Sequence, residues 1–485
     1  MAVSMTQNPG DYNVAYGPNV VTLDGLGSAN KYVLQVQTQT GTVLADIRQS
    51  ANSNGVAMFD IQNILQTYVA PPDKETPAAG VGNNDVLALS ANEVFKYILR
   101  IGSETGGTVT LESASYGPYQ VWDGVKEYYE ENYQTYGGVW PLRAATQGDD
   151  ASPACTEVVA EARPLTSWRY SRTGSQLAGT PSGLGANEVY YVFDVLAGEQ
   201  MTMSYFNDVL RVSPPPASQA NHIEGFRIVT FSGSTQTQDV VIPNITPNGG
   251  GPNASYGGTV AGNGDSLIVN MGVGPLNLAN VPYTDASGNS QTFQLGNPTH
   301  YYIIPLAYNP GTCLATHTGF SDEPLMSPIR INIKPADCLD YDPIRFAWLN
   351  PYGVMDYYTF KKKNVKSVNT KRNTFLKDAN DYDGTTFDID PASRGFQVYS
   401  QSIKENWLAT TGYLTDQEAE YLQYLFRSAD VRVVLGDNAR PGYETQWFPV
   451  VIESTKWTEK TYQKDKLFQY EISFRLANNI KSQRG

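Results

Sequence analysis

Cysteine is almost missing from this chain, which has 3 Cys in 485 residues. Cys155, Cys313 and Cys338 form no C-x-x-C pair, and an odd number of cysteines does not fit a disulfide framework. We therefore expect three reduced, buried thiols in a protein that folds in a reducing cytosol.

Histidine is equally scarce, and this limits the chemistry that the chain can perform. A Ser-His-Asp or Cys-His catalytic pair would need one of the 3 histidines, His222, His300 and His317. No G-x-S-x-G nucleophile elbow and no phosphate-binding P-loop occurs. Cys313 and His317 lie four residues apart in "CLATH", but a zinc site would need a second such pair. We expect no enzymatic activity and no cofactor.

Long apolar runs and a targeting leader are also lacking. The start, "MAVSMTQNPGDYNVAYG", has neither a basic segment nor an apolar one. No stretch approaches 18 consecutive apolar residues, the length that crosses a bilayer. We expect a protein that is neither exported through a standard leader nor inserted in a membrane.

Charge is low and unevenly placed. Charged residues make up 17% of the chain, and the net charge is −14. Residues 1–335 hold 14 Lys or Arg and 28 Asp or Glu, a balance of −14, whereas residues 336–485 hold 20 of each. The acidic part repels the phosphates of nucleic acid, so we expect no nucleic-acid binding. The balanced C-terminal part can face a neighbouring subunit without that repulsion.

Basic residues gather in one short stretch of the C-terminal part. Six of them fall within twelve residues: Lys361, Lys362, Lys363, Lys366, Lys371 and Arg372. We predict that they are interface residues that meet the acidic first domain of an adjacent copy, so that head-to-tail contacts build a ring. The alternative, a basic hairpin end that is simply solvated, stays open.

Acidic residues gather just after this cluster, in "KDANDYDGTTFDID" (377–390). Asp381, Asp383 and Asp390 occupy positions 3, 5 and 12 of a calcium-loop template, with Gly384 at position 6. Position 1 falls on Ala379, which has no carboxylate, and position 12 is the shorter Asp. These three aspartates form a weak calcium candidate, and a solvated acidic turn is the favoured interpretation.

The composition favours β structure. Tyr numbers 32, and Gly (43) and Pro (29) together number 72, which is typical of strands joined by many turns. We predict a mainly β, multidomain protein. Residues 1–150 and 151–337 form β-sandwich-like domains, the first with one short helix and the second with a long Gly/Asn-rich loop at 247–264. Residues 338–485 form an α+β domain.

Hydrophobic periodicity locates the elements of the first two domains. Alternation predicts strands over 31–38, 42–49, 93–102, 188–196, 225–233, 239–245, 265–273, 299–308 and 327–335. After Asp60, which is placed to cap a helix, apolar residues follow at helical spacing: Ile61, Ile64, Leu65 and Tyr68.

The last domain mixes a helix with strands. Thr415 and Glu418 have the spacing of a capping box, and the helix that follows is predicted to end near Ser428. Its apolar face consists of Ala419, Leu422, Leu425 and Phe426. Further strands are predicted over 431–435, 446–454 and 467–477.

The domain opens with "CLDYDPIRFAWLNPYGVMDYYTFKKK" (338–363). Ile344, Phe346 and Trp348 alternate with polar or small residues, so 343–349 is predicted as a strand. "NPYG" is a turn signal with Pro351 in second place, and the chain then returns as a second strand. We predict a β-hairpin.

The same stretch resembles structural proteins of tailed phages that infect Bacteroidota, the crAss-like phages among them. Three other stretches carry the resemblance: "ADIRQSANSNGVAMFDIQNILQTYV" (45–69), "LTDQEAEYLQYLFRSADVRVVL" (414–435) and "WFPVVIESTKWTEKTYQKDKLFQYEISFRLANN" (447–479). The resemblance implies a virion component of the tail, ring, collar, connector or baseplate, assembled in the host cytoplasm. None of these motifs is catalytic, so no active-site residues follow from it.

Three functions compete at this point. The favoured one is a virion structural subunit that forms a homo-oligomer, in the form of a ring, and contacts other virion proteins. The second is a receptor- or carbohydrate-binding tail protein, because exposed aromatic side chains and the Gly/Asn-rich loop suit sugar stacking. The third is a polysaccharide-degrading tail enzyme, but no 20–50-residue repeat typical of a β-helix occurs.

Overall fold

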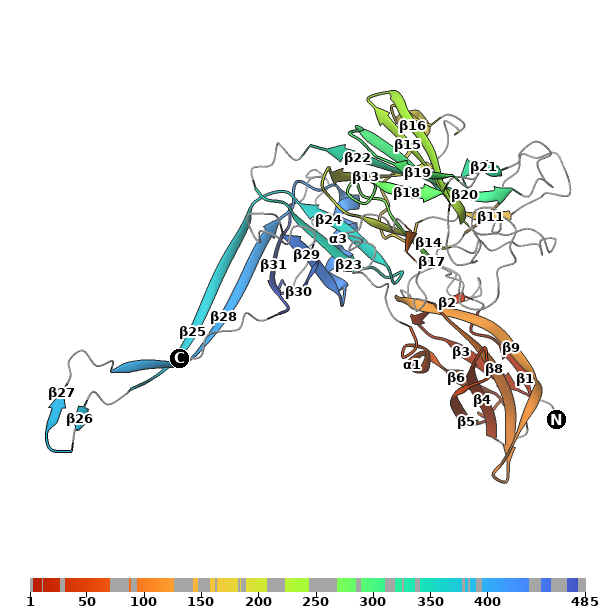
Figure 1. Cartoon of the computed structure of the whole chain (residues 1–485). Coiled ribbons are helices and arrows are strands. Elements are labelled where there is room, and N and C mark those ends of the chain that lie inside the picture. The colour runs from red at the N-terminus through yellow and green to blue at the C-terminus, as the bar shows by residue number, and fades with distance from the viewer. Residues whose placement is uncertain are drawn as a thin grey trace. The chain divides into compact units, whose positions relative to one another are not determined.

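The structure of the chain is a computed structural model. It describes residues 3–10, 12–26, 31–69, 87–88, 94–125, 143–146, 158–161, 164–181, 184, 189–206, 223–243, 268–284, 289–309, 319–324, 327–335, 341–376, 380–382, 384–389, 395–435, 446–454 and 469–478. The fold is mainly β, as predicted, with strands in several separate sheets (Figure 1). Among these residues no helix has the length and apolarity needed to cross a bilayer.

The chain divides into two compact units. Unit 1 comprises Met1–Asp337 together with Leu349–Asp356, and unit 2 comprises Cys338–Trp348 and Tyr357–Gly485. Residues 1–150 and 151–337 both belong to unit 1. The returning segment Leu349–Asp356 contains the "NPYG" turn, so the turn is part of unit 1 although it interrupts the sequence of unit 2.

The N-terminal part of unit 1 is a β-sandwich of two sheets. One sheet has the order β1-β3-β6, with β1 Ser4–Gln7, β3 Val20–Asp24 and β6 Ala57–Asp60. The other has the order β2-β9-β8-β4-β5, with β2 Tyr12–Tyr16, β9 Thr108–Val125, β8 Val94–Thr105, β4 Lys31–Thr38 and β5 Val43–Ser50. The strands pair antiparallel except β2 and β9, which pair in parallel.

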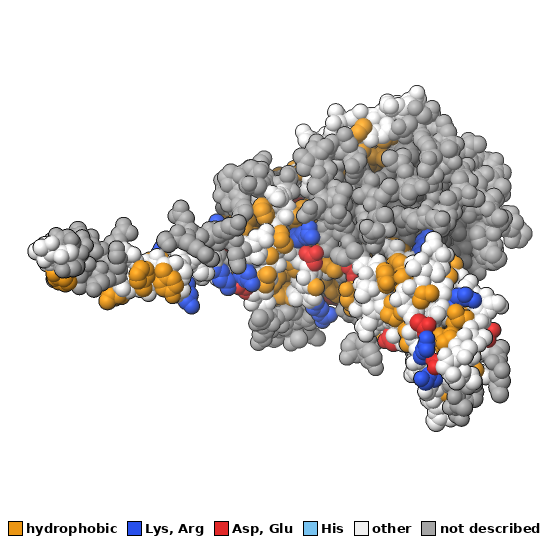
Figure 2. Space-filling model, turned by 60° about the horizontal axis from the view of Figure 1, so that its bottom comes forward, with side chains coloured by type: hydrophobic (Ala, Val, Ile, Leu, Met, Phe, Trp, Pro, Cys, Tyr) orange, Lys and Arg blue, Asp and Glu red, His pale blue; other side chains and the backbone are white. Residues whose placement is uncertain are grey.

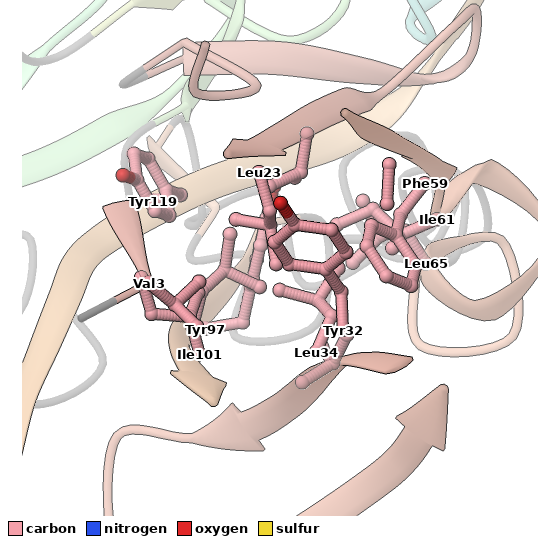
Figure 3. Close-up of a cluster of buried hydrophobic side chains, with 14 of the residues drawn as sticks. Val3, Leu23, Tyr32, Leu34, Phe59, Ile61, Leu65, Tyr97, Ile101 and Tyr119 are labelled. Carbon is pink, nitrogen blue, oxygen red and sulfur yellow. The ribbon is translucent and has the colours of Figure 1, made fainter. Parts of the chain in front are cut away.

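The core of this sandwich comes from both sheets. Leu23 and Phe59 from the first sheet pack with Tyr32, Leu34 and Tyr97 from the second, and all five are buried (Figure 3). The core residues of β4 and of β8 follow the spacing of two that a strand gives, as at Tyr32 and Leu34.

The predicted short helix is present as α1 (Gln62–Leu65). Ile61 takes the N-cap position, and the Asp60 carboxylate accepts a hydrogen bond from the backbone N–H of Gln62 at 3.0 Å. Ile61 and Leu65 are fully buried in the sandwich core. The helix therefore closes one end of the core, where its apolar residues leave water.

A second β-sandwich follows in unit 1. Its larger sheet has the order β12-β13-β22-β20-β15-β16, with β21 also paired to β20. These strands are β12 Ser171–Thr173, β13 Val189–Leu196, β22 Ile329–Lys334, β20 His300–Asn309, β15 Ile223–Ser232, β16 Thr235–Pro243 and β21 Gly319–Pro324, and the 3₁₀ turn η1 (Gly174–Gln176) lies after β12. The smaller sheet has the order β14-β17-β7, with β14 Thr202–Phe206, β17 Ile268–Gly272 and β7 Leu87–Ala88.

Strand β20 shows how the larger sheet is covered on both faces. On one face the Tyr301 hydroxyl donates to the carbonyl of Val273, which follows β17, at 2.6 Å. On the other face Tyr302 packs with Tyr190 and Phe231 in a second apolar cluster. The run of apolar residues in β20 without polar alternation reflects this burial on both faces. Two ribbons complete the described part of unit 1: β10 (Arg143–Thr146) with β11 (Val158–Glu161), and β18 (Val281–Thr284) with β19 (Ser290–Phe293).

Unit 2 is built on one seven-stranded antiparallel sheet. Its order is β24-β23-β29-β30-β31-β28-β25, with β24 Met355–Phe360, β23 Ile344–Leu349, β29 Val431–Leu435, β30 Phe448–Ile452, β31 Glu471–Leu476, β28 Phe396–Thr410 and β25 Asn364–Leu376. A short ribbon of β26 (Asn380–Tyr382) and β27 (Phe387–Ile389) lies between β25 and β28 in the sequence.

The one long helix described, α3 (Asp416–Arg427), covers part of this sheet, so unit 2 is α+β. The predicted capping box is confirmed, because Thr415 accepts from the Glu418 N–H while Glu418 accepts from the Thr415 N–H. Tyr421 of the helix packs on Trp348 of β23, with ring centroids 5.0 Å apart. Its hydroxyl also bonds the backbone of Tyr357, so the helix is fixed to two neighbouring strands.

The "NPYG" turn is confirmed. The Gly353 N–H donates to the Asn350 carbonyl at 3.0 Å, and the Asn350 side chain accepts from the N–H groups of Tyr352 and Val354. The turn is held on the end of β9: the Val125 N–H donates to the Pro351 carbonyl at 2.6 Å. These bonds satisfy most of the turn's backbone within protein.

Asp356 ends this segment as a buried carboxylate. Its oxygens accept from the Thr166 hydroxyl at 2.5 Å, from the Ser167 N–H at 3.1 Å and from the Ser167 hydroxyl. Burial raises the pKa of Asp356 above 3.8, although hydrogen bonds from Ser167, Thr166 and Asn350 oppose the shift. The carboxylate thus ties Leu349–Asp356 to the segment that leads into the second sandwich.

Gly353 offers a sharp test of how tightly the turn is held. At its φ of +77° a Cβ would lie 1.2 Å from the Asp123 carbonyl oxygen, so Gly353→Ala forces the turn off β9. We expect a loss of several kcal/mol in unfolding free energy, compared with about 1 kcal/mol for the left-handed backbone alone. Gly41→Ala is the matched control, because Gly41 has φ +87° and no atom within 4 Å of its Cβ position. Equal falls in thermal midpoint for the two variants would contradict this account.

Asp356 predicts a pH dependence of stability with a definite sign. Because its folded-state pKa is raised, the folded chain binds this proton more tightly than the unfolded chain. The contribution of Asp356 to stability is therefore largest below its ordinary pKa and falls as pH rises through the raised pKa. Asp356→Asn removes this pH-dependent contribution to the unfolding free energy. Thermal midpoints of wild type and variant, measured from acid to neutral pH, should diverge in favour of the variant as pH rises, whereas parallel curves would refute the assignment.

Candidate functional site

The strands β25 and β28 form a long ribbon, which we name the arm (Figure 1). They pair from Asn364 opposite Ala409 to Leu376 opposite Phe396. Along β28, β31 pairs only with Trp407–Thr410, so in the described part of the sheet the rest of the arm is two strands wide. A two-stranded ribbon is marginally stable in water, and both of its edges have unpaired backbone groups. Among the described elements, the arm is therefore a candidate for contact with another molecule.

The two faces of the arm differ along its shaft, residues 366–373 and 400–407. Face A of the shaft carries Lys366, Val368, Thr370 and Arg372 from β25 and Gln401, Ile403, Glu405 and Trp407 from β28. Face B carries Ser367, Asn369, Lys371 and Asn373 from β25 and Ser400, Ser402, Lys404 and Asn406 from β28. This assignment follows from the antiparallel register, in which directly opposite residues share a face. Face A thus mixes apolar and charged side chains, and face B is wholly polar.

At its distal end the arm is apolar on both faces. An irregularity in the register at Asn373/Thr374 leaves Tyr399 without an opposite residue. Beyond it Leu376 and Phe396 share face A and are 67% and 72% exposed. Phe375 and Tyr399 lie together on face B, with ring centroids 6.2 Å apart. Figure 2 shows hydrophobic side chains gathered toward this end and basic side chains nearer the base of the arm.

Large exposed side chains of this kind are unusual on a protein surface that touches only water. Four of them, Phe375, Leu376, Phe396 and Tyr399, lie within a few residues of one another across the two strands. A contiguous apolar surface marks a binding site more often than chance exposure does. The distal end is therefore the strongest candidate contact surface on the arm.

The six predicted interface residues lie on the arm or directly before it, but they do not form one patch. Lys366 is already neutralised, because it pairs with Glu405 at 3.1 Å and lies over the Trp407 ring. Lys371 and Arg372 are both exposed and lie on opposite faces. Lys361, Lys362 and Lys363 precede β25 at the base of the arm, where the Lys363 carbonyl accepts from the Thr410 N–H.

Of the three aspartates of the weak calcium candidate, only Asp381 lies in the described residues. Asp381 lies on β26, opposite Asp388 of β27. Asp383 and Asp390 lie outside the described residues, as does the Gly/Asn-rich loop at 247–264. Within the described ranges no group of three or more metal-ligating side chains occurs.

Of the histidines and cysteines, only His300 falls in the described residues. Its ring stacks on Phe231 at 5.0 Å, and its Nε2 lies 3.3 Å from the Gly179 carbonyl. Burial, and after it the charge of Arg330, lower the pKa of His300 to about 4. Arg330 in turn donates to the Tyr302 hydroxyl at 2.6 Å. His300 is thus a packed core residue of the second sandwich.

The lowered pKa of His300 gives a second test by pH. The folded chain binds this proton less tightly than the unfolded chain, so stability falls as pH drops from 6.5 toward about 4. His300→Phe keeps an aromatic ring on Phe231 but cannot titrate. Wild type should lose thermal stability relative to this variant over that window. A constant difference between their midpoints from pH 7 to about 4 would show that His300 is not the titrating group.

The candidate contact residues that the sequence analysis missed are the apolar ones at the distal end. The only sequence signal for them lies in "FQVYSQSIKENWLAT" (396–410), where apolar residues alternate with polar ones. The apolar residues have even numbers at Phe396 and Val398 but odd numbers at Ile403 and Trp407. This change of phase is what an extra residue in one strand produces.

Comparisons with known proteins add little. No protein-family model matches the chain, and no curated protein matches it. One solved structure that shows a likeness is that of Salmonella alpha-2-macroglobulin reacted with methylamine, with 8% sequence identity and a TM-score of 0.16. The match covers 97% of this chain and 29% of that one, so the chain spans less than a third of its length. A likeness this distant carries no argument about fold or function.

Proposed function

We propose that this chain is a structural subunit of a tailed-phage virion, in the tail, ring, collar, connector or baseplate, and that the arm is its assembly element. The observation that carries the proposal is a two-stranded ribbon with unpaired edges and exposed Phe375, Leu376, Phe396 and Tyr399. A subunit that works within an assembly can keep such a ribbon because its neighbours cover it.

The rest of the molecule agrees with a building element. The described parts of unit 1 are two β-sandwiches and two short ribbons, and the described histidine and the buried Asp356 both serve packing. The resemblance of four stretches to phage structural proteins gives the particular setting. Under this proposal the subunit forms homo-oligomers and contacts other virion proteins in the host cytoplasm.

The proposal is tested by locating the protein in phage particles. Purified virions, analysed by mass spectrometry and by electron microscopy with an antibody against this chain, should contain it in many copies at the neck or baseplate. Label confined to fibre tips would favour the receptor-binding alternative. Absence from virions, or turnover of capsular polysaccharide that one carboxylate substitution abolishes, would overturn the proposal.

A further inference from the structure

The surface of the arm indicates how it is covered. On the shaft, face B is polar at every position from Ser367 to Asn373 and at the facing positions of β28. Face A carries Val368, which is 54% exposed, and, diagonally across the ribbon, the half-buried Ile403. A ribbon lying on a partner surface buries its apolar face and leaves its polar face in water. The shaft therefore fits a surface on its face A side alone.

At the distal end a partner would have to cover both faces of the arm. Leu376 and Phe396 project from face A while Phe375 and Tyr399 project from face B. Covering only one face would leave two large aromatic side chains in water. The distal end therefore fits into a cleft that encloses both faces.

Charge indicates the kind of partner. Residues 361–376 carry six Lys or Arg and no Asp or Glu. If the outer edges of two β25 strands paired, Lys371 and Arg372 of both copies would come together, which like charges oppose. The acidic complement is present in the chain itself, because residues 1–335 have a balance of −14. Such a contact joins two different patches, so it runs head to tail from copy to copy.

Resting on the proposed function, we propose that the occupant of this surface is a second copy of this chain. The arm of one copy lies with face A on the acidic 1–335 part of the next copy and inserts its distal end there, while face B of the shaft stays in water. Beyond the contact predicted for the basic cluster, the inference names the face of the arm that lies on the partner and the end that is inserted.

Adjacent residues on opposite faces provide a matched pair of variants. Arg372→Glu reverses a charge on face A, and Lys371→Glu makes the same reversal one residue away on face B. We expect Arg372→Glu to weaken self-association of the full chain by about tenfold or more, and Lys371→Glu to change it by less than about threefold. Sedimentation at several concentrations and at low and high salt measures both, with thermal midpoints as the folding control. Equal effects of the two variants, or a wild-type chain that stays monomeric throughout, would overturn the inference.

Photo-crosslinking identifies the occupant directly. A benzoylphenylalanine at position 376, on face A of the distal end, should cross-link to residues 1–335 of another copy, and the same probe at position 369, on face B of the shaft, should give little product. Cross-links from 376 to another arm would overturn the inference. In virions, cross-links from 376 only to a different protein would overturn it too while leaving the proposed function intact. Absence of the chain from virions would instead remove the proposed function.

Discussion

A strand at the edge of a sheet leaves a row of backbone N–H and C=O groups that need partners, either in protein or in water. In unit 1 the Asn350–Gly353 turn finds such partners in protein: the backbone of Pro351 meets Val125, and Gly353 lies against Asp123 without room for a side chain. In unit 2 the arm leaves two long edges open. The turn has its partners within one chain, whereas the edge groups of the arm are left to water or to another molecule.

The same contrast holds for polar side chains. Asp356 is a buried carboxylate, yet each of its oxygens has a hydroxyl or N–H partner, which offsets much of the cost of removing a charge from water. On the arm, by contrast, charge is left exposed at Lys371 and Arg372. Exposed cations on an edge ribbon also keep like ribbons apart, so they limit unwanted pairing.

Much of the architecture was predictable from the sequence, and the reasons are local. The capping box at Thr415 and Glu418 needs only two residues at the right spacing, and the structure contains it. The apolar pattern in 31–38 predicted β4 with the same bounds, because Tyr32, Leu34 and Val36 of that strand are buried in the core. The role of Asp356 could not be predicted, because its partners Thr166 and Ser167 lie about 190 residues away in sequence. The arm was missed because β25 is polar along most of its length and the phase of β28 changes at Tyr399.

The membership of Leu349–Asp356 in unit 1 also sets an order in time. A ribosome delivers residues from the N-terminus at about 5–20 per second, and domains fold as their last segment emerges. Unit 1 receives its last segment only after Cys338–Trp348 of unit 2 has been translated. Until then the end of β9 lacks the turn that lies on it, and Thr166 and Ser167 lack their carboxylate. The two units are therefore interleaved during synthesis, and the first cannot be completed before the second has begun.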